Sequence, residues 1–215
     1  GLGDVYKRQN LDHAIHGFLN QSDEFVDKIY HREEDINNVS HAITDYLVKS
    51  NQLSLPLADQ KILGSMFYVV NDIERIGDHA ENFADYTKTE IKHNTGLTGD
   101  AKEEIKKMYT AVSRLLKLSL ECFMEQDGVN KPEDKLAEIA ILEASIDKME
   151  RRYQKHHIKR LAKGECEPRA GLLFSDMLSE LERIADHSVN IAYSMSDEDE
   201  DEMLAAENEA LATTV

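Results

Sequence analysis

One nine-residue motif occurs twice in this chain and constrains its fold more than any other feature. Residues 74–82 read E-R-I-G-D-H-A-E-N, and residues 182–190, 108 positions later, read E-R-I-A-D-H-S-V-N. Each copy spaces a Glu, an Asp and an Asn at i, i+4 and i+8, so on an α-helix the three side chains form a ladder on one face. A repeat of this kind predicts a protein built from two copies of one unit, with the ladder acting in both.

Apolar residues recur at steps of three and four through most of the chain, which is the period of amphipathic helices packed in a bundle. No segment shows the alternation of a strand. Pro56, Pro132 and Pro168 each precede such an apolar run, where a missing N–H costs little. We therefore predict an all-α protein of two tandem three-helix-bundle repeats, with six helices running up and down. The apolar runs cover residues 11–19, 25–46, 62–83, 105–122, 139–153 and 174–191.

Shifts in composition divide the chain into four parts. The first part, residues 1–9, has no apolar core and does not continue the helical pattern that follows it, so we expect it to be a non-native leader. The last part, residues 196–215, contains eight acidic residues and no Lys or Arg, which predicts a disordered tail. The first helix has barely a dozen plausible residues, whereas its counterpart runs from about residue 100 to 126, so we expect it to be truncated. The parts are the leader (1–9), repeat 1 (10–96), repeat 2 (97–195) and the acidic tail (196–215).

The net charge of −17 excludes several classes of partner. No basic patch is large enough to follow nucleic-acid phosphates, and the negative charge disfavours direct binding to anionic lipids. No stretch approaches the ~20 apolar residues that a membrane-spanning helix needs, so we expect no membrane insertion. Cys122 and Cys166 are the only cysteines and lack metal-binding spacing, which indicates a reducing compartment.

Acidic pairs at i, i+4 flank the apolar stripes of the last two helices in each predicted repeat. Neighbouring helices pack ~8–10 Å apart, so pairs on facing flanks converge, and their carboxylates repel unless a cation lies between them. Oxygen ligands suit a divalent or trivalent metal ion such as iron, manganese, magnesium or zinc, and Gly77 and Ala185 leave room for close approach. In repeat 1, Asn37 stands in the place of an acid and weakens the pattern. The predicted metal ligands are Glu33, Glu74, Asp78, Glu143, Asp147, Glu182 and Asp186.

Two other interpretations fit the same residues. Acids at i, i+4 also line ordinary solvated faces, so the bundle is alternatively a metal-free scaffold. A carboxylate-bridged metalloenzyme needs two Glu-x-x-His motifs, and only Glu90 with His93 has that spacing, so we do not expect an enzyme. His79 and His187 follow the ladder Asp and either donate to a ligating carboxylate or pack or face solvent.

The chain resembles the PhoU family, whose members carry tandem three-helix units with a D/E-x-x-x-D pattern on the last two helices. The resemblance covers about residues 10–195 and depends mainly on the motif E-R-I-G/A-D-H-x-x-N, which is present in both units. The run I-T-D-Y-L-V-K at residues 43–49 looks more like the cytoplasmic region behind the membrane domain of bacterial Na⁺/phosphate cotransporters. The truncated first helix fits that subfamily as well.

The resemblance implies a non-catalytic, cytoplasmic regulatory domain of a sodium-dependent phosphate transporter, tethered to or peripheral at the inner membrane. Its partner would be the transmembrane transporter domain, and a homo-oligomer would be compatible with the resemblance. The family's metal-cluster positions would fall on the seven ligands given above, with Asn37 departing from the pattern. The alternative within the family is a free-standing regulator of phosphate uptake.

Overall fold

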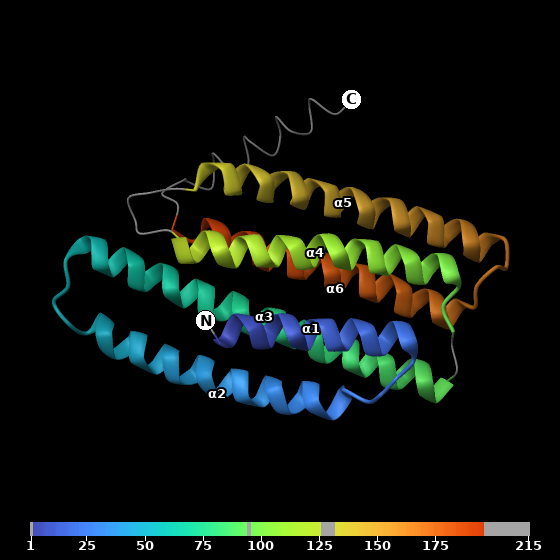
Figure 1. The fold of residues 1–215 in the computed structure, drawn as a ribbon, viewed down its shortest axis with the longest axis horizontal. Helices are drawn as coiled ribbons and strands as arrows, with labels where there is room; N and C mark the ends of the chain where they lie inside the picture. Colours follow the sequence, from blue (N-terminus) through green and yellow to red (C-terminus); the bar gives the residue numbers. More distant parts are fainter. Residues whose placement is uncertain (1, 94–95, 126–131, 196–215) are drawn as a thin grey trace.

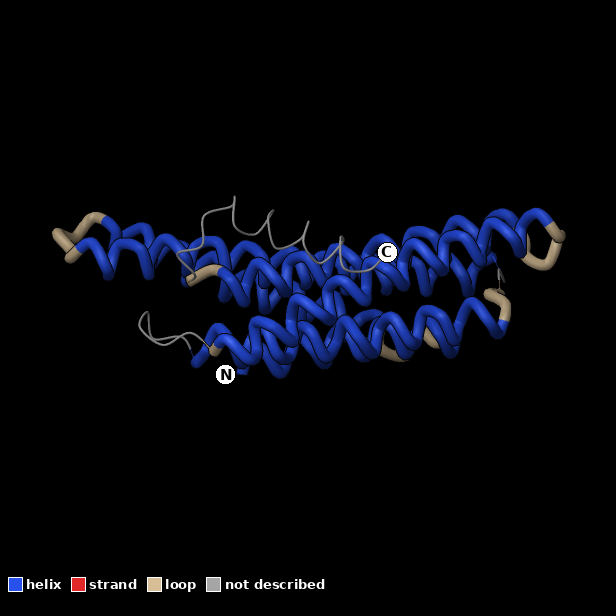
Figure 2. Tube along the Cα trace, turned by 90° about the horizontal axis from the view of Figure 1, so that it is seen from above, coloured by secondary structure: helices blue, strands red, loops and turns tan. Residues whose placement is uncertain are grey.

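The computed structural model describes residues 2–93, 96–125 and 132–195. Within these ranges it contains six α-helices and no strand, which confirms the predicted all-α class. The helices run along one long axis (Figures 1 and 2). They are α1 (Leu2–Asn20), α2 (Val26–Asn51), α3 (Leu57–His93), α4 (Gly99–Glu125), α5 (Glu133–Ala162) and α6 (Pro168–Tyr193).

The helices form two three-helix units, α1–α3 and α4–α6, which lie side by side (Figure 1). In the first unit α3 contacts both α1 and α2, and in the second unit α6 contacts both α4 and α5. The third helices of the two units, α3 and α6, also contact each other and form most of the boundary between the repeats. The two motif copies are therefore placed on helices that face each other.

Local sequence sets several helix ends. Pro168 occupies the first turn of α6, where its missing N–H has no partner to lose, and Glu167 before it is extended. Pro132 directly precedes the first residue of α5. After α5, Gly164 has a φ of 68°, a left-handed conformation that a glycine adopts without steric cost and that ends the helix.

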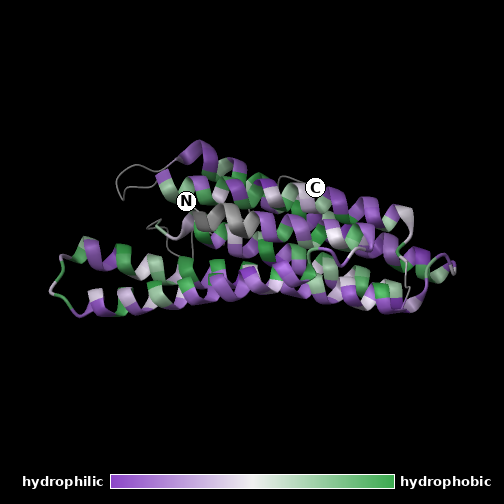
Figure 3. Cartoon of the chain, turned by 60° about the horizontal axis from the view of Figure 1, so that its bottom comes forward, coloured by the Kyte–Doolittle hydropathy of each residue, from purple (hydrophilic) through white to green (hydrophobic). Residues whose placement is uncertain are grey.

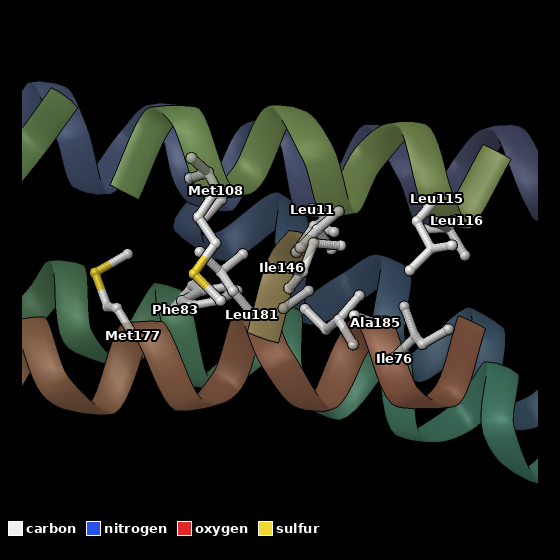
Figure 4. Close-up of a cluster of buried hydrophobic side chains, with 14 of the residues drawn as sticks. Leu11, Ile76, Phe83, Met108, Leu115, Leu116, Ile146, Met177, Leu181 and Ala185 are labelled. Atoms are coloured by element: carbon white, nitrogen blue, oxygen red, sulfur yellow. The ribbon is translucent and has the colours of Figure 1, made fainter. Parts of the chain in front are cut away.

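One apolar core extends through both repeats. Phe18, Phe83 and Phe174 are among its largest fully buried side chains and come from α1, α3 and α6. Side chains from both units meet within it, among them Phe83 of α3 and Leu181 of α6 (Figure 4). Burial of each such side chain contributes about 1.5–3 kcal/mol, so the shared core holds the repeats together as well as each repeat within itself.

The first helix differs from the sequence-based expectation. It begins at Leu2 and so includes most of the segment 1–9 that we expected to lie outside the helical pattern. At 19 residues it is still shorter than its counterpart α4, which has 27. Because α1 is short, the α2–α3 hairpin projects beyond it at one end of the bundle (Figures 1 and 2). The predicted tail, 196–215, lies outside the described residues.

No helix among the described residues combines the length and the apolar character needed to cross a bilayer. Along the bundle, hydrophilic and hydrophobic residues alternate around each helix as amphipathic packing requires (Figure 3).

Candidate functional site

The histidine of the first motif reaches across the boundary between the repeats. His79 of α3 pairs through Nδ1 with Oε2 of Glu180 on α6, and both side chains are at least nine-tenths buried. Asn82 donates to the same carboxylate oxygen at 3.2 Å, and the hydroxyl of Tyr86 donates to Oε1 at 3.1 Å. Glu180 is therefore a buried carboxylate surrounded by three donors from the other repeat.

The second motif makes the equivalent contact with the roles of α3 and α6 exchanged. His187 of α6 lies with Nδ1 at 2.9 Å from Oδ1 of Asp72 on α3, and the Nδ2 of Asn190 lies at 3.5 Å from the same oxygen. Asp72 and Glu180 occupy the same position in the two motif copies, two residues before the motif Glu. The rings of His79 and His187 lie near the centre of this arrangement, with centroids 5.6 Å apart. We call these six side chains with Tyr86 the reciprocal contact: Asp72, His79, Asn82, Tyr86, Glu180, His187 and Asn190.

The protonation of Glu180 follows from its surroundings. Burial raises the pKa of this carboxyl, but the hydrogen bonds from His79 and Asn82 and the charge of His79 outweigh burial and hold the pKa below its usual range. An ionised Glu180 can only accept hydrogen bonds, so His79 Nδ1 carries the proton. The same carboxylate, together with burial, raises the pKa of the Tyr86 hydroxyl far above its ordinary value, which keeps that hydroxyl a donor.

In repeat 2, Asp147 of α5 acts electrostatically on Glu182 of α6. The pKa of Glu182 is raised by burial and then by the negative charges of Asp186, Asp147 and Glu150. The charges that act on Glu182 therefore come from α5 as well as from its own helix. Asp147 also pairs with Arg151 one turn along its own helix, at 3.5 Å. These carboxylates make this part of repeat 2 strongly acidic, and we call them the α5–α6 acidic cluster: Asp147, Glu150, Glu182 and Asp186.

In repeat 1 the predicted ligands Glu33 and Asp78 lie in different environments. Glu33 of α2 is 2% exposed, accepts a hydrogen bond from Asn10 Nδ2 at 2.8 Å and lies against Gly77 of α3. Asp78 is about half exposed and pairs weakly with Arg75, at 3.8 Å. The expected close approach at Gly77 is confirmed, because any Cβ there would overlap the Glu33 carboxylate.

Two observations bear on whether these residues suit a metal ion. Across the described ranges, no group of three or more His, Cys, Asp or Glu side chains is arranged to hold an ion. However, Asn37 Oδ1, at the repeat 1 position where the pattern lacks an acid, is buried and has no hydrogen-bond partner. This amide oxygen can therefore coordinate a metal ion or accept a hydrogen bond from a bound molecule.

The Glu-x-x-His pair at the end of α3 does not form a metal-binding arrangement. Glu90 is fully buried and accepts a hydrogen bond from Gln21 Nε2 at 3.1 Å, whereas His93 is exposed. The two side chains therefore lie in different environments.

Sequence analysis missed the partners of the motif histidines. We considered His79 and His187 as donors to ligating carboxylates, or as packed or solvent-facing side chains; they pair instead with Glu180 and Asp72 of the other repeat. A signal was present: an acid stands two residues before the motif Glu in both copies. The pairing itself depends on α3 facing α6, which the motif alone does not show.

Comparisons with known proteins agree with this architecture. A family model described as "PhoU domain" matches residues 6–87 and 105–195, which includes both motif copies. Two curated relatives are described as phosphate-specific transport system accessory protein PhoU homologs. The one from Synechocystis is 28% identical over 175 residues, covering 79% of this chain and 72% of that protein. The one from Clostridium acetobutylicum is 22% identical over 195 residues, covering 90% and 85%.

Two solved structures share the fold. PhoU from Pseudomonas aeruginosa has a TM-score of 0.79 at 20% identity and covers 90% of each chain. The phosphate transport system regulatory protein PhoU from Streptococcus pneumoniae has a TM-score of 0.76 at 22% identity, covering 91% of this chain and 88% of that one. The likeness extends over both three-helix units.

Proposed function

Because the chain belongs to the PhoU family, we propose that it is a non-catalytic regulator of phosphate transport. The observation that carries the proposal is the family match over both repeats, with both motif copies inside it. The structure adds a physical role for the motif: its His and Asn side chains hold the third helices of the two units together through buried carboxylates. A regulator needs a defined contact between its two repeats if a structural change in one repeat is to be transmitted to the other.

Within the family, the free-standing regulator is the better supported role. The Synechocystis and Clostridium relatives are both accessory proteins of phosphate-specific transport systems, and each aligns with most of this chain. The sodium cotransporter assignment rested on one short run of sequence and on the short first helix. We therefore propose that the chain acts from the cytoplasmic side on a transmembrane phosphate transporter made as a separate protein.

We also propose that the α5–α6 acidic cluster binds a hard cation, which would draw its carboxylates closer together than they lie in this structure. Its support is electrostatic: Glu182 is half-buried beside Asp186 and Asp147, and mutual repulsion among such groups is relieved when a cation binds between them. Oxygen ligands of this kind favour magnesium, manganese or iron over softer ions. In repeat 1 the predicted ligands Glu33, Glu74 and Asp78 are a second, weaker candidate, because Asn37 stands in the place of an acid.

The regulatory role is tested by deleting the gene in its own bacterium and measuring uptake of labelled phosphate in phosphate-rich medium. We expect the deletion to change uptake and the intact chain to restore it. Replacing sodium with potassium in the assay separates the two family roles. An effect that persists without sodium supports the free-standing regulator, whereas an effect that disappears supports the cotransporter assignment. Uptake that is identical with and without the gene overturns the proposal.

The cation site is tested by metal analysis of protein purified without chelators. We expect bound metal that is lost when Glu182→Gln is combined with Asp186→Asn. Asp176→Asn is the matched control, since Asp176 lies on α6 outside the cluster. Protein that contains no metal and binds none on titration would support the metal-free scaffold instead.

A further inference from the structure

The second half of α5 carries a row of positive charges in an otherwise acidic chain. Four basic residues follow one another at i, i+4 spacing, so they lie along one side of the helix and its C-cap. Residues 151–164 contain no acid, and residues 151–172 carry a net charge of +5, whereas the whole chain carries −17. We call the four residues the basic ladder: Arg151, Lys155, Lys159 and Lys163.

The fold alone does not explain the basic ladder. Like charges at i, i+4 repel each other and destabilise a helix, and the ladder contains three such pairs in succession. Cations in the last turn of a helix interact favourably with its dipole, which accounts for Lys159 but not for the two basic residues before it. The repulsion would be relieved by negative charge brought in from outside the protein.

The centre of the ladder has no partner among the described residues. Its first and last members each pair with an acid at 3.5 Å, Asp147 and Glu165 respectively. Between them, Lys155 and Lys159 are exposed and form no ion pair with any residue that the structure describes. These two ammonium groups are therefore free to bind an anionic partner.

A pocket between the ladder and α4 does not provide a site for a small anion. Its walls carry as many carboxylates as Lys and Arg side chains, four of each. One of these carboxylates, Glu104, is already bound by His156 at 2.6 Å and by Arg160 at 2.8 Å. The pocket is thus close to neutral, and the unbalanced positive charge lies on the outer face of α5.

Exposed apolar side chains lie beside the ladder. A hydrogen bond of 2.9 Å joins Ser175 of α6 to Gln154 of α5. Ile158 is one turn nearer the α5–α6 turn than Gln154, and Leu172 is one turn nearer it than Ser175, so the hydrogen bond aligns these two side chains. They are 63% and 67% exposed. With a third exposed residue on the same side of α5, they form what we call the apolar seam: Ile158, Leu161 and Leu172.

The ladder and the seam lie at one end of the molecule. The α5–α6 turn is at the opposite end of the bundle from the α2–α3 turn (Figures 1 and 2). Ile158 follows Lys155 by three residues, so the basic and the apolar side chains share one face of α5. A flat surface that approaches this end can therefore contact both kinds of side chain at once.

We propose that the basic ladder and the apolar seam bind the surface of an anionic lipid bilayer. Lipid phosphates lie against Lys155 and Lys159, while Ile158 and Leu172 enter the boundary between the headgroups and the acyl chains. The exposed apolar side chains favour this partner over an acidic protein segment, which the charges alone would serve. The net charge of −17 disfavours lipid binding by the chain as a whole, so the contact is confined to this end.

Sedimentation of the full chain with lipid vesicles tests the proposal. We expect binding to phosphatidylglycerol vesicles that weakens as salt is added, and none to phosphatidylcholine vesicles. Lys155→Glu combined with Lys159→Glu should weaken binding by about 30-fold or more. Lys49→Glu combined with Lys61→Glu is the matched control, because it changes the net charge equally at exposed positions of the α2–α3 hairpin. The control should bind nearly as well as the wild type.

Fluorescence tests the part played by the apolar seam. The chain contains no tryptophan, so Leu172→Trp introduces a single fluorophore. We expect its emission to shift to shorter wavelength when phosphatidylglycerol vesicles are added, because the indole enters an apolar environment. Ile141→Trp is the matched control: Ile141 is 71% exposed on α5 but lies outside the seam, and its emission should not shift.

Each other outcome overturns the proposal. A chain that does not bind phosphatidylglycerol vesicles leaves an acidic protein segment as the partner of the ladder. An equal loss in the two double variants shows that net charge, and not the ladder, controls binding. Emission of Leu172→Trp that does not shift excludes contact of the seam with lipid. The vesicles contain no transporter, so these results are independent of the proposed role in phosphate uptake. All the substituted side chains are exposed, and circular dichroism checks that the variants keep their helix content.

Discussion

His79 of α3 and Glu180 of α6 form a buried hydrogen-bonded pair that joins the two repeats. The pair between His187 and Asp72 repeats this relation with the roles of the helices exchanged. The reciprocal contact explains why both motif copies contain His and Asn at the same positions. Those side chains bind the acid that precedes the other copy, whereas the motif Glu and Asp take no part in this contact.

The reciprocal contact predicts a large cost for removing its central carboxylate. Glu180→Ala leaves His79, Asn82 and Tyr86 without their shared acceptor in a buried site. Hydrogen bonds to a charged group contribute about 1.5–3 kcal/mol, so we expect the free energy of unfolding to fall by about 3 kcal/mol. Urea denaturation followed by circular dichroism measures this change.

Glu182→Ala is the matched control, because Glu182 lies two residues away on α6 but its neighbours are other carboxylates. We expect little loss of stability there. A double-mutant cycle of Glu180→Ala with His79→Ala should give a coupling of about 1–3 kcal/mol between the two residues. Additive effects of the two substitutions would contradict the pairing.

A second prediction concerns the close packing of α2 against α3. In Gly77→Ala the new Cβ would overlap the Glu33 carboxylate, which is buried and bound by Asn10. Glu33 must then move and lose that hydrogen bond, so we expect a destabilisation of about 1–3 kcal/mol. Thermal or urea unfolding of the variant provides the measurement.

Gly64→Ala is the internal control on the same helix. A Cβ at Gly64 meets nothing within 4 Å. Alanine is the better helix former, so this substitution should stabilise the protein by about 0.5–1 kcal/mol. Equal effects at the two glycines would show that helix propensity, and not contact with Glu33, determines the result at position 77.

The fold could be predicted from the sequence because its determinants are local. The apolar steps at Ile76, Phe83 and Ile146 set both the helices and their buried faces, and all three residues are in the core. The length of α1 was harder to predict. Its first residues carry no apolar stripe of their own, yet the structure extends the helix back to Leu2.

The candidate site was only partly predictable. Helical geometry placed Glu182 and Asp186 on a flank of α6, and the structure brings Asp147 of α5 near them. The partners of His79 and His187 could not be derived in this way, because a helical wheel gives the direction of a side chain but not the helix it meets. That information lies in how the two repeats pack, which depends on the whole shared core.

A third prediction concerns pH and the buried Glu90. Burial raises its pKa above the ordinary value of 4.5, although the charge of Lys102 and hydrogen bonds from Gln21 and the Leu97 backbone oppose the rise. An acid whose pKa is higher in the folded state stabilises the fold most when protonated, so its contribution is lost as the pH rises above 4.5. Glu90→Gln should therefore match the wild type near pH 4 and be more stable at pH 7. A stability difference that does not change with pH would contradict this assignment.

The last prediction links the α5–α6 acidic cluster to stability. If a cation binds among Glu182, Asp186 and Asp147, it binds the folded chain and not the unfolded one, and the free energy of unfolding must rise with its concentration. At about 100 times the dissociation constant the gain is about 2.7 kcal/mol. Thermal unfolding with added Mn²⁺ measures this gain, and a chelator should reverse it. In Glu182→Gln with Asp186→Asn the gain should vanish, whereas Asp176→Asn, on the same helix, should keep it. An equal gain in all three proteins would show that the ion acts on the surface charge in general, since the net charge of −17 attracts any cation.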